Sequence, residues 1–208
     1  MNNETIETLA PIPLLDLEAL PHDSHMIGEY SLPNYNKGRQ PLKFIIYKRW
    51  LVIAALFEFS LVPHGEKLER DFVDHFQVEF PIQAARWFVE AIRRCFLPPG
   101  DPRAMKPGAM AILEKVNGEW LHLTRGFHSG GHNIPGYSFS NVSRLEHDEQ
   151  PMMKQSLEIG DPEIFDRIDG KPVISPDKFA GFMERIAERY ESGEFGPPVP
   201  VKIEDSMW

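Results

Sequence analysis

The segment from Arg125 to Ser140 holds the densest set of side chains in this sequence that could do chemistry. It reads RGFHSGGHNIPGYSFS and contains one arginine, two histidines, three Phe or Tyr rings and four glycines. His128 and His132 are four residues apart, the spacing that places two metal ligands on one face of a helix. The glycines between them and the following Pro135 disfavour a helix, and zinc needs three or four protein ligands. We therefore predict no bound metal or other cofactor, and a metal-dependent enzyme using these histidines is the third of three hypotheses.

Nucleophilic catalysis has little support in the sequence. Cys95 is the single cysteine, and it lies within RRCF, where no histidine is close enough in sequence to act as its base. The sequence contains no serine-nucleophile elbow, phosphate-binding loop or dinucleotide fingerprint, so we expect a protein that is not an enzyme. A single cysteine also excludes an intramolecular disulfide, and the first residues lack the basic and apolar runs of a secretory signal. We therefore expect a cytoplasmic protein.

Rings and cations in the chain could instead bind nucleic acid. Single-strand binders combine a basic groove with aromatic rings, and each stacked base contributes about 1–3 kcal/mol. In KFIIYKRW, strand alternation puts Lys43, Tyr47 and Arg49 on one face, opposite an apolar face that we expect to enter the core. In EWLHLTRGF the same rule turns Trp120 outward, and the segment that follows adds an arginine and further rings beside its glycines. The candidate nucleic-acid-binding residues are Lys43, Tyr47, Arg49, Trp120, Arg125, Phe127, Tyr137 and Phe139.

Charge is distributed unevenly along the chain, whose formal net charge is −9. Residues 1–36 carry −6, residues 37–145 carry +5 and residues 146–208 carry −8. A basic body between acidic flanks would suit a polyanionic ligand. The same segregation would equally suit a chain whose acidic flanks serve solubility or bind other proteins.

Strand and helix patterns alternate in a repeated order. KFIIYKRW, LVIAALFEFSLV and HFQVEF are rich in β-branched and aromatic residues, which predicts strands. A helix is predicted to start at Pro81 and to end at LPPG. Asn117-Gly118 predicts a tight hairpin, and a second helix has Ser175 as its N-cap and Gly193 just past its end. The sequence therefore predicts an α+β fold, with curved antiparallel sheet, two helices and a strands-then-helix pseudo-repeat.

Composition divides the chain into three parts. We expect residues 1–36 to form an irregular acidic N-terminal arm, partly laid on the body through IPLLDLEAL. Residues 37–193 form an α+β domain, with a basic part at 37–145 and an acidic part at 146–193. Residues 194–208 predict a flexible proline- and glycine-rich linker with an acidic, aromatic tip. The candidate partner-binding residues of this tip are Glu204, Asp205 and Trp208.

The stretch FQVEFPIQAARWFVEAIRRCF resembles the strand-to-helix ending of Pur-alpha repeats and of the related Whirly-type single-stranded nucleic-acid-binding folds. The resemblance covers residues 43–96 and, in the order of elements, 43–190. It implies curved antiparallel sheets each followed by a helix, two units that pair, and a basic and aromatic strand face whose counterpart is Lys43, Tyr47 and Arg49. The end of the chain, KIEDSMW, is similar in kind to the acidic, aromatic-ended tip of bacterial single-stranded DNA-binding proteins, which implies recruitment of partner proteins.

These features support three hypotheses of function. The leading one is a non-enzymatic, cytoplasmic protein that binds single-stranded DNA or RNA and self-associates as a dimer or a larger assembly. The alternative is an acidic protein-interaction module, such as an adaptor, an inhibitor or a decoy of phage or mobile-element origin, with a partner bound through the C-terminal tip. The third is the metal-dependent enzyme named above. The most apolar run, LVIAALFEF, is too short to span a bilayer, so no membrane partner is expected.

Overall fold

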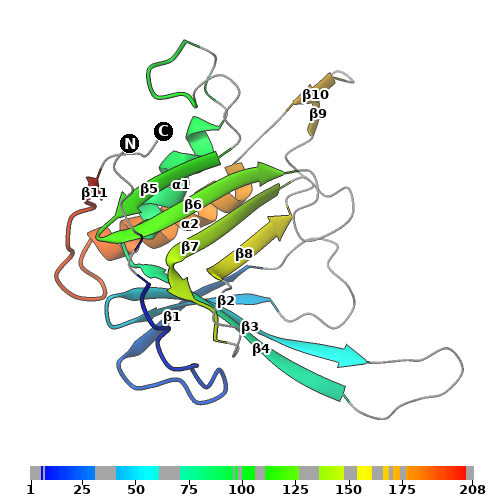
Figure 1. Cartoon of the computed structure of the whole chain (residues 1–208), viewed down its shortest axis with the longest axis vertical. Helices are drawn as coiled ribbons and strands as arrows, with labels where there is room; N and C mark the ends of the chain where they lie inside the picture. Colours follow the sequence, from blue (N-terminus) through cyan, green and yellow to red (C-terminus); the bar gives the residue numbers. More distant parts are fainter. Residues whose placement is uncertain are drawn as a thin grey trace, which may run out of the picture.

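Among the residues that it describes, the computed structural model has two larger antiparallel sheets and two α-helices, so the predicted α+β class is confirmed (Figure 1). The described residues are 6, 8–30, 41–60, 71–95, 97, 100–105, 111–126, 136–147, 154–160, 166–168, 171–173 and 177–204. The four-stranded sheet has the order β1 (Ser24–Tyr30), β2 (Leu42–Tyr47), β3 (Trp50–Ser60) and β4 (Asp71–Pro81). The five-stranded sheet has the order β11 (Ile203–Glu204), β5 (Ala111–Val116), β6 (Glu119–Gly126), β7 (Gly136–Leu145) and β8 (Lys154–Gly160). A separate pair joins β9 (Asp166–Ile168) to β10 (Lys171–Val173).

Each of the two larger sheets is built from strands that follow one another in the chain, and a helix follows each run of strands. The run β1 to β4 leads into α1 (Ala84–Arg94), and the run β5 to β8 leads, past the β9–β10 pair, into α2 (Asp177–Glu191). Strands that follow one another in the chain pair as antiparallel neighbours, which requires only a short connection between them. The predicted strands-then-helix order therefore occurs twice. The predicted irregular arm, 1–36, is wrong at Ser24–Tyr30, because β1 pairs with β2 on both sides of a register shift between Met26 and Gly28.

Tight turns set the register of the hairpins. Asn117 and Gly118 have φ angles of 48° and 93°, and they join β5 to β6 with Val116 opposite Glu119. A two-residue hairpin turn needs positive φ at these positions, which Asn and Gly tolerate best. The predicted hairpin is therefore confirmed. Lys48, in the turn between β2 and β3, also has a positive φ of 55°.

One apolar core is shared by both larger sheets and both helices. Phe88 of α1 packs edge-on against Phe80 of β4, with ring centroids 4.9 Å apart, and against Phe139 of β7 at 4.7 Å. Phe182 of α2 packs against Phe44 of β2 at 4.8 Å. Edge-to-face ring pairs add about 0.5–1.5 kcal/mol to the large apolar area that each ring buries. The two halves of the chain are thus joined through aromatic contacts that involve both helices.

The two helices run antiparallel and are joined at their surface by charged side chains. Arg86 donates two hydrogen bonds to Glu191, at 2.8 and 2.6 Å, and Arg93 donates two to Glu184, at 3.0 and 2.8 Å. Exposed pairs of this kind contribute little, typically about 0–1 kcal/mol. The buried faces of the helices therefore dominate their packing. No helix in the described part of the chain is long and apolar enough to cross a membrane.

The C-terminal segment, residues 194–204, lies against the body of the protein. The main-chain N–H of Val199 donates to the hydroxyl of Tyr190 at 2.9 Å, and that of Asn117 donates to the carbonyl of Lys202 at 2.8 Å. β11 then adds a short strand to the edge of β5 (Figure 1). Strand pairing and main-chain hydrogen bonds thus connect to the body a segment whose composition predicts a flexible linker.

Candidate functional site

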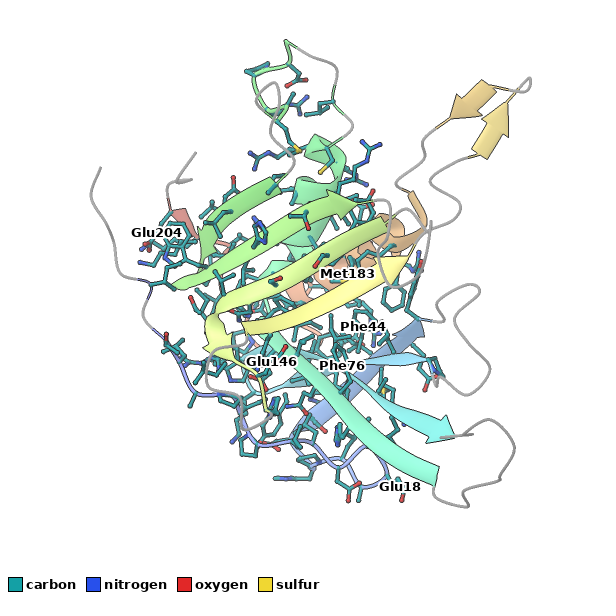
Figure 2. All side chains as sticks on the ribbon, turned by 45° about the vertical axis from the view of Figure 1, so that its right-hand side comes forward. Glu18, Phe44, Phe76, Glu146, Met183 and Glu204 are labelled. Carbon is teal, nitrogen blue, oxygen red and sulfur yellow. The ribbon has the colours of Figure 1, made fainter. Side chains whose placement is uncertain are left out.

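The N-terminal arm, here residues 8–20, lies across the outer face of the four-stranded sheet. Leu15 and Leu17 are only 3% and 7% exposed. Figure 2 shows Glu18 of the arm on the opposite side of this sheet from Met183, which belongs to the shared core. The two leucines belong to a second apolar cluster, whose sheet residues alternate with the residues that face the shared core. The sheet part of this cluster consists of Ile45, Trp50, Val52 and Ala54.

Two side chains of β4 bind the main chain of the arm. Glu79 accepts a hydrogen bond from the N–H of Ile12 at 3.1 Å. Gln77 accepts one from the N–H of Leu15 at 2.9 Å and donates one to the carbonyl of Pro13 at 3.3 Å. Because successive side chains of a strand alternate between faces, Gln77 and Glu79 point the same way, toward the arm.

The end of β7 binds the part of the arm that precedes Ile12. Arg144 donates a hydrogen bond to the carbonyl of Ala10 at 2.8 Å. The N–H of Leu9 donates to the carbonyl of Ser143 at 2.7 Å, and the N–H of Leu145 donates back to the carbonyl of Leu9 at 3.2 Å. This pair of bonds is a parallel β-bridge, so the arm adds to the end of β7 as a strand would. We call the arm-binding site the surface made of Ile45, Trp50, Val52, Ala54, Gln77, Glu79 and Arg144.

The carboxylate of Glu79 is the most enclosed charge of this site, with no exposed surface. Its hydrogen-bond donors are His147 at 2.6 Å, Gln77 at 3.0 Å, Gln155 at 3.1 Å and the N–H of Ile12 at 3.1 Å. Burial by itself raises the pKa of a carboxyl group. Hydrogen bonds from these donors, that of His147 being the strongest, outweigh burial and hold the pKa of Glu79 below its ordinary value. The charged form of Glu79 is therefore the form that fits this site.

Arg144 and Glu119 form a second buried charge pair beside Glu79. The guanidinium of Arg144 donates to both carboxylate oxygens of Glu119, at 2.9 and 2.8 Å, and lies 3.9 Å from the ring centroid of Trp50. Asn141 bridges the two carboxylate residues by donating to Glu119 at 2.6 Å and to the carbonyl of Glu79 at 2.8 Å. A buried ion pair offsets its desolvation only when its geometry is good and its other polar groups are satisfied. The network therefore depends on all of its members, including the arm.

The arrangement has one feature of an acid–base pair, because His147 lies against a buried carboxylate. The His147 side chain is 14% exposed, and its Nε2 points at Glu79. Since a carboxylate only accepts, this nitrogen carries the hydrogen. Within the described residues, no group of three or more His, Cys, Asp and Glu side chains gathers as metal ligands. The polar atoms of the site are thus directed mainly at each other and at the main chain of the arm.

Three of the rings expected to stack bases are buried. Trp120 is 6% exposed, and Tyr137 and Phe139 have no exposed surface. The expectation that these rings lie on an accessible surface is wrong. Tyr137 and Phe139 alternate in β7 with Ser138 and Ser140, so the pleat turns both rings into the shared core. Trp120 lies outside that core, on the other side of β6 from its buried neighbours, and is nevertheless covered.

The predicted cations do not line one groove. Lys43 donates to a main-chain carbonyl of the arm at 3.3 Å, and Tyr47 packs against the second apolar cluster. Arg49 is exposed, with its guanidinium 4.7 Å from the ring centroid of Trp50. Arg125 is half-buried on the other sheet, where strand pairing places it directly opposite the buried Tyr137 of β7. Lys43 and Tyr47 therefore lie on the sheet face that the arm covers, and Arg125 lies on the other sheet.

The remaining predicted residues fall at the ends of described segments or beyond them. Glu204 pairs with Lys115 at 3.2 Å and with Lys202 at 2.7 Å, on the edge formed by β11. These contacts use the carboxylate that was expected to meet a partner. The residues that lie outside the described part of the chain are Phe127, His128, His132, Asp205 and Trp208.

Sequence reasoning missed the polar residues that hold the arm. The alternation of HFQVEF gave Gln77 and Glu79 as the polar face of a strand, yet they are 5% and 0% exposed. The sequence suggested that IPLLDLEAL lies on the body, but not that it covers the polar face of this strand. Glu79 and His147 are separated by 68 positions, and no local pattern links them.

Two surface hollows lie beside the helices. One, of about 320 Å³, lies between the start of α1, the end of α2 and residues 198–201. The other, of about 610 Å³, is lined by Glu90, Arg93, Arg94, Leu97 and Arg103. Each of its three arginines donates to a carboxylate of Glu184, Glu114 or Asp101. Its positive charge is therefore compensated, and it is a poor site for a polyanion.

The chain matches no protein-family model, no curated protein and no solved structure. The fold and the site therefore define this protein only by its architecture. It is an α+β protein in which two antiparallel sheets share one core with two helices, and in which the N-terminal arm lies across one sheet.

Proposed function

We propose that this chain is a non-enzymatic protein-interaction module that binds an extended peptide segment at the arm-binding site. One observation carries the proposal. Gln77, Glu79 and Arg144 are 5%, 0% and 4% exposed, and their polar atoms point at the main chain of the arm. Burying such groups is unfavourable unless they are hydrogen-bonded. A surface of this composition is therefore suited to a bound peptide.

The chemistry of the preferred peptide follows from how the arm is held. Main-chain hydrogen bonds can form with peptides of many sequences, so the contacts of the peptide side chains determine which peptides bind. Here the selective positions are Leu15 and Leu17, two residues apart as in an extended chain. Pro11 and Pro13 precede them, and proline favours the extended backbone that the site accepts. The module is thus suited to proline-containing segments with two apolar residues at alternate positions.

The proposal is tested by asking whether the site binds the arm as a separate peptide. The double variant Leu15→Asp, Leu17→Asp releases the arm, and a fluorescent peptide of residues 6–20 is titrated against it by anisotropy. The released variant should bind the peptide at least about tenfold more tightly than the natural chain, whose own arm competes at a high effective concentration. Circular dichroism establishes that the variant is folded.

The matched control uses Leu14, which is 48% exposed. Leu14→Asp should leave the arm in place and peptide binding as weak as in the natural chain. A peptide with aspartate in place of its two buried leucines should not bind. If the folded, released variant does not bind the natural peptide, the proposal is wrong.

A second candidate function is single-stranded nucleic-acid binding. It is favoured by the repeated order of sheet and helix, which is the order implied by the resemblance to Pur-alpha repeats and Whirly-type folds. Lys43 and Tyr47 lie under the arm, so their use as a binding face requires the arm to leave. Arg49 is exposed in the arm-bound state.

Titration with single-stranded DNA, single-stranded RNA and duplex probes across salt tests this second candidate. Binding through phosphates weakens linearly in log affinity as log salt rises. The arm-released variant should then bind more tightly than the natural chain, and Arg49→Ala should weaken binding to every sequence. If neither the natural chain nor the released variant binds at low salt, nucleic-acid binding is wrong.

A further inference from the structure

We propose that the arm-binding site takes the arm of a second copy of this chain, so that two copies exchange arms and form a symmetric dimer. The inference rests on the proposed function, because it names the peptide that the site binds. An identical chain brings the same Leu15 and Leu17, and the same main-chain groups, to the same surface. It therefore satisfies every contact seen between the arm and the body.

The connection between the arm and β1 is short and held by few contacts. Residues 21–23 form a turn that is closed by Ser24, whose N–H and hydroxyl both donate to the carbonyl of Pro21, at 2.9 and 2.6 Å. His22 and Asp23 are exposed. Water can therefore replace these two hydrogen bonds when the turn opens. An opened turn carries the arm away from its own sheet and leaves the arm's own conformation unchanged.

The closed monomer and the exchanged dimer differ little in their contacts. In the dimer, each hydrogen bond of Gln77, Glu79 and Arg144 to the arm forms between chains and not within one. The two forms differ in the conformation of the turn, which is closed in the monomer and open in the dimer. They also differ in the entropy that two chains lose when they associate. Exchange of an identical element between two copies gives a closed dimer, because each site receives one arm and none is left free to bind a third copy. The balance between the two forms then depends on concentration and on the length of the connection.

Light scattering after size exclusion measures the mass of the natural chain over a range of concentrations. We expect a monomer and a dimer whose ratio shifts with concentration. Mixing isotopically heavy and light protein should give dimers of mixed mass in native mass spectrometry, slowly, because each exchange requires the arm to leave its site. The double variant Leu15→Asp, Leu17→Asp should lose the dimer, and Leu14→Asp should keep it.

A shortened connection gives a second, independent measurement. Deleting His22 and Asp23 removes the turn, so the arm no longer reaches its own sheet and nearly all of the protein should be dimeric. If the natural chain and the shortened chain are both monomeric, or if the dimer persists in the arm-released variant, arm exchange is wrong. The peptide titration separates the two proposals, because binding of the peptide by a protein that stays monomeric rejects the exchange alone.

Discussion

Nε2 of His147 lies 2.6 Å from a carboxylate oxygen of Glu79, although the two residues are 68 positions apart in the chain. Glu79 belongs to β4 and His147 follows β7, so this contact joins the two larger sheets where the arm crosses them. The other oxygen of the same carboxylate accepts from the N–H of Ile12. One buried carboxylate thus connects both halves of the fold to the N-terminal arm.

Replacing this carboxylate should destabilise the protein strongly. Glu79→Ala leaves the donors of His147 and Gln155 without their acceptor in a buried place, and Arg144 loses a nearby negative charge. Breaking a buried charged network from one side costs about 3–5 kcal/mol. The free energy of unfolding in urea measures the loss. The matched control Glu90→Ala removes an exposed carboxylate of α1 and should stay within about 0.5 kcal/mol of the natural chain.

The stability of the protein should fall in acid partly through the same residue. The pKa of Glu79 is held below its ordinary value, chiefly by the hydrogen bond from His147 acting against burial. A carboxyl group with a lowered pKa in the folded state stabilises that state above its ordinary pKa, and the contribution is lost as pH falls through the folded pKa. Unfolding measured between neutral and strongly acidic pH should show a smaller loss in Glu79→Gln than in the natural chain. Equal losses would contradict this account.

Phe139 should behave as a core residue and not as a surface for bases. It has no exposed surface and packs 4.7 Å from Phe88, centroid to centroid. Phe139→Ala opens a cavity and should lower the free energy of unfolding by about 3–5 kcal/mol. Phe139→Leu keeps most of the volume and should cost well under half as much. An alanine variant as stable as the natural chain would mean that this ring does not occupy the core.

Cys95 should react slowly with thiol reagents in the folded protein. Burial raises the pKa of its thiol to about 11, against the weaker opposing effect of Arg125 and Arg94. Compared with a free thiol of pKa about 8.5, the thiolate fraction at neutral pH is smaller by a factor of roughly 300. Because the thiol is half-buried and its pKa is raised, a thiol reagent should react with Cys95 far more slowly in the folded protein than after denaturation. Ser192→Cys, at an exposed position, serves as the control and should react at once. Reaction of the natural chain as fast as that of Ser192→Cys would contradict the raised pKa of the Cys95 thiol.

Local patterns were enough to predict the strands β2 to β7, both helices and their order, but they missed β1, β8 and β11. Asn117-Gly118 marked its hairpin because only residues tolerant of positive φ fit such a turn. The first helix was visible because its apolar residues recur at helical spacing after a strand. The alternation of YSFS also favoured a core position for Tyr137 and Phe139, and the expectation of surface rings went against that signal.

The sequence by itself determined the α+β order, the hairpin and the polar or apolar character of each strand face, because those depend on neighbours a few residues apart. Only the tertiary structure decided what covers each face. Gln77 and Glu79 are polar in either environment, and their burial depends on an arm more than sixty residues earlier in the chain. The same holds for the C-terminal segment, whose prolines and glycines predict flexibility until β5 offers it an edge to pair with. Contacts between distant segments depend on the tertiary fold of the whole chain. A hydrophobic pattern of period two or 3.6 reports on local structure and carries no information about these contacts.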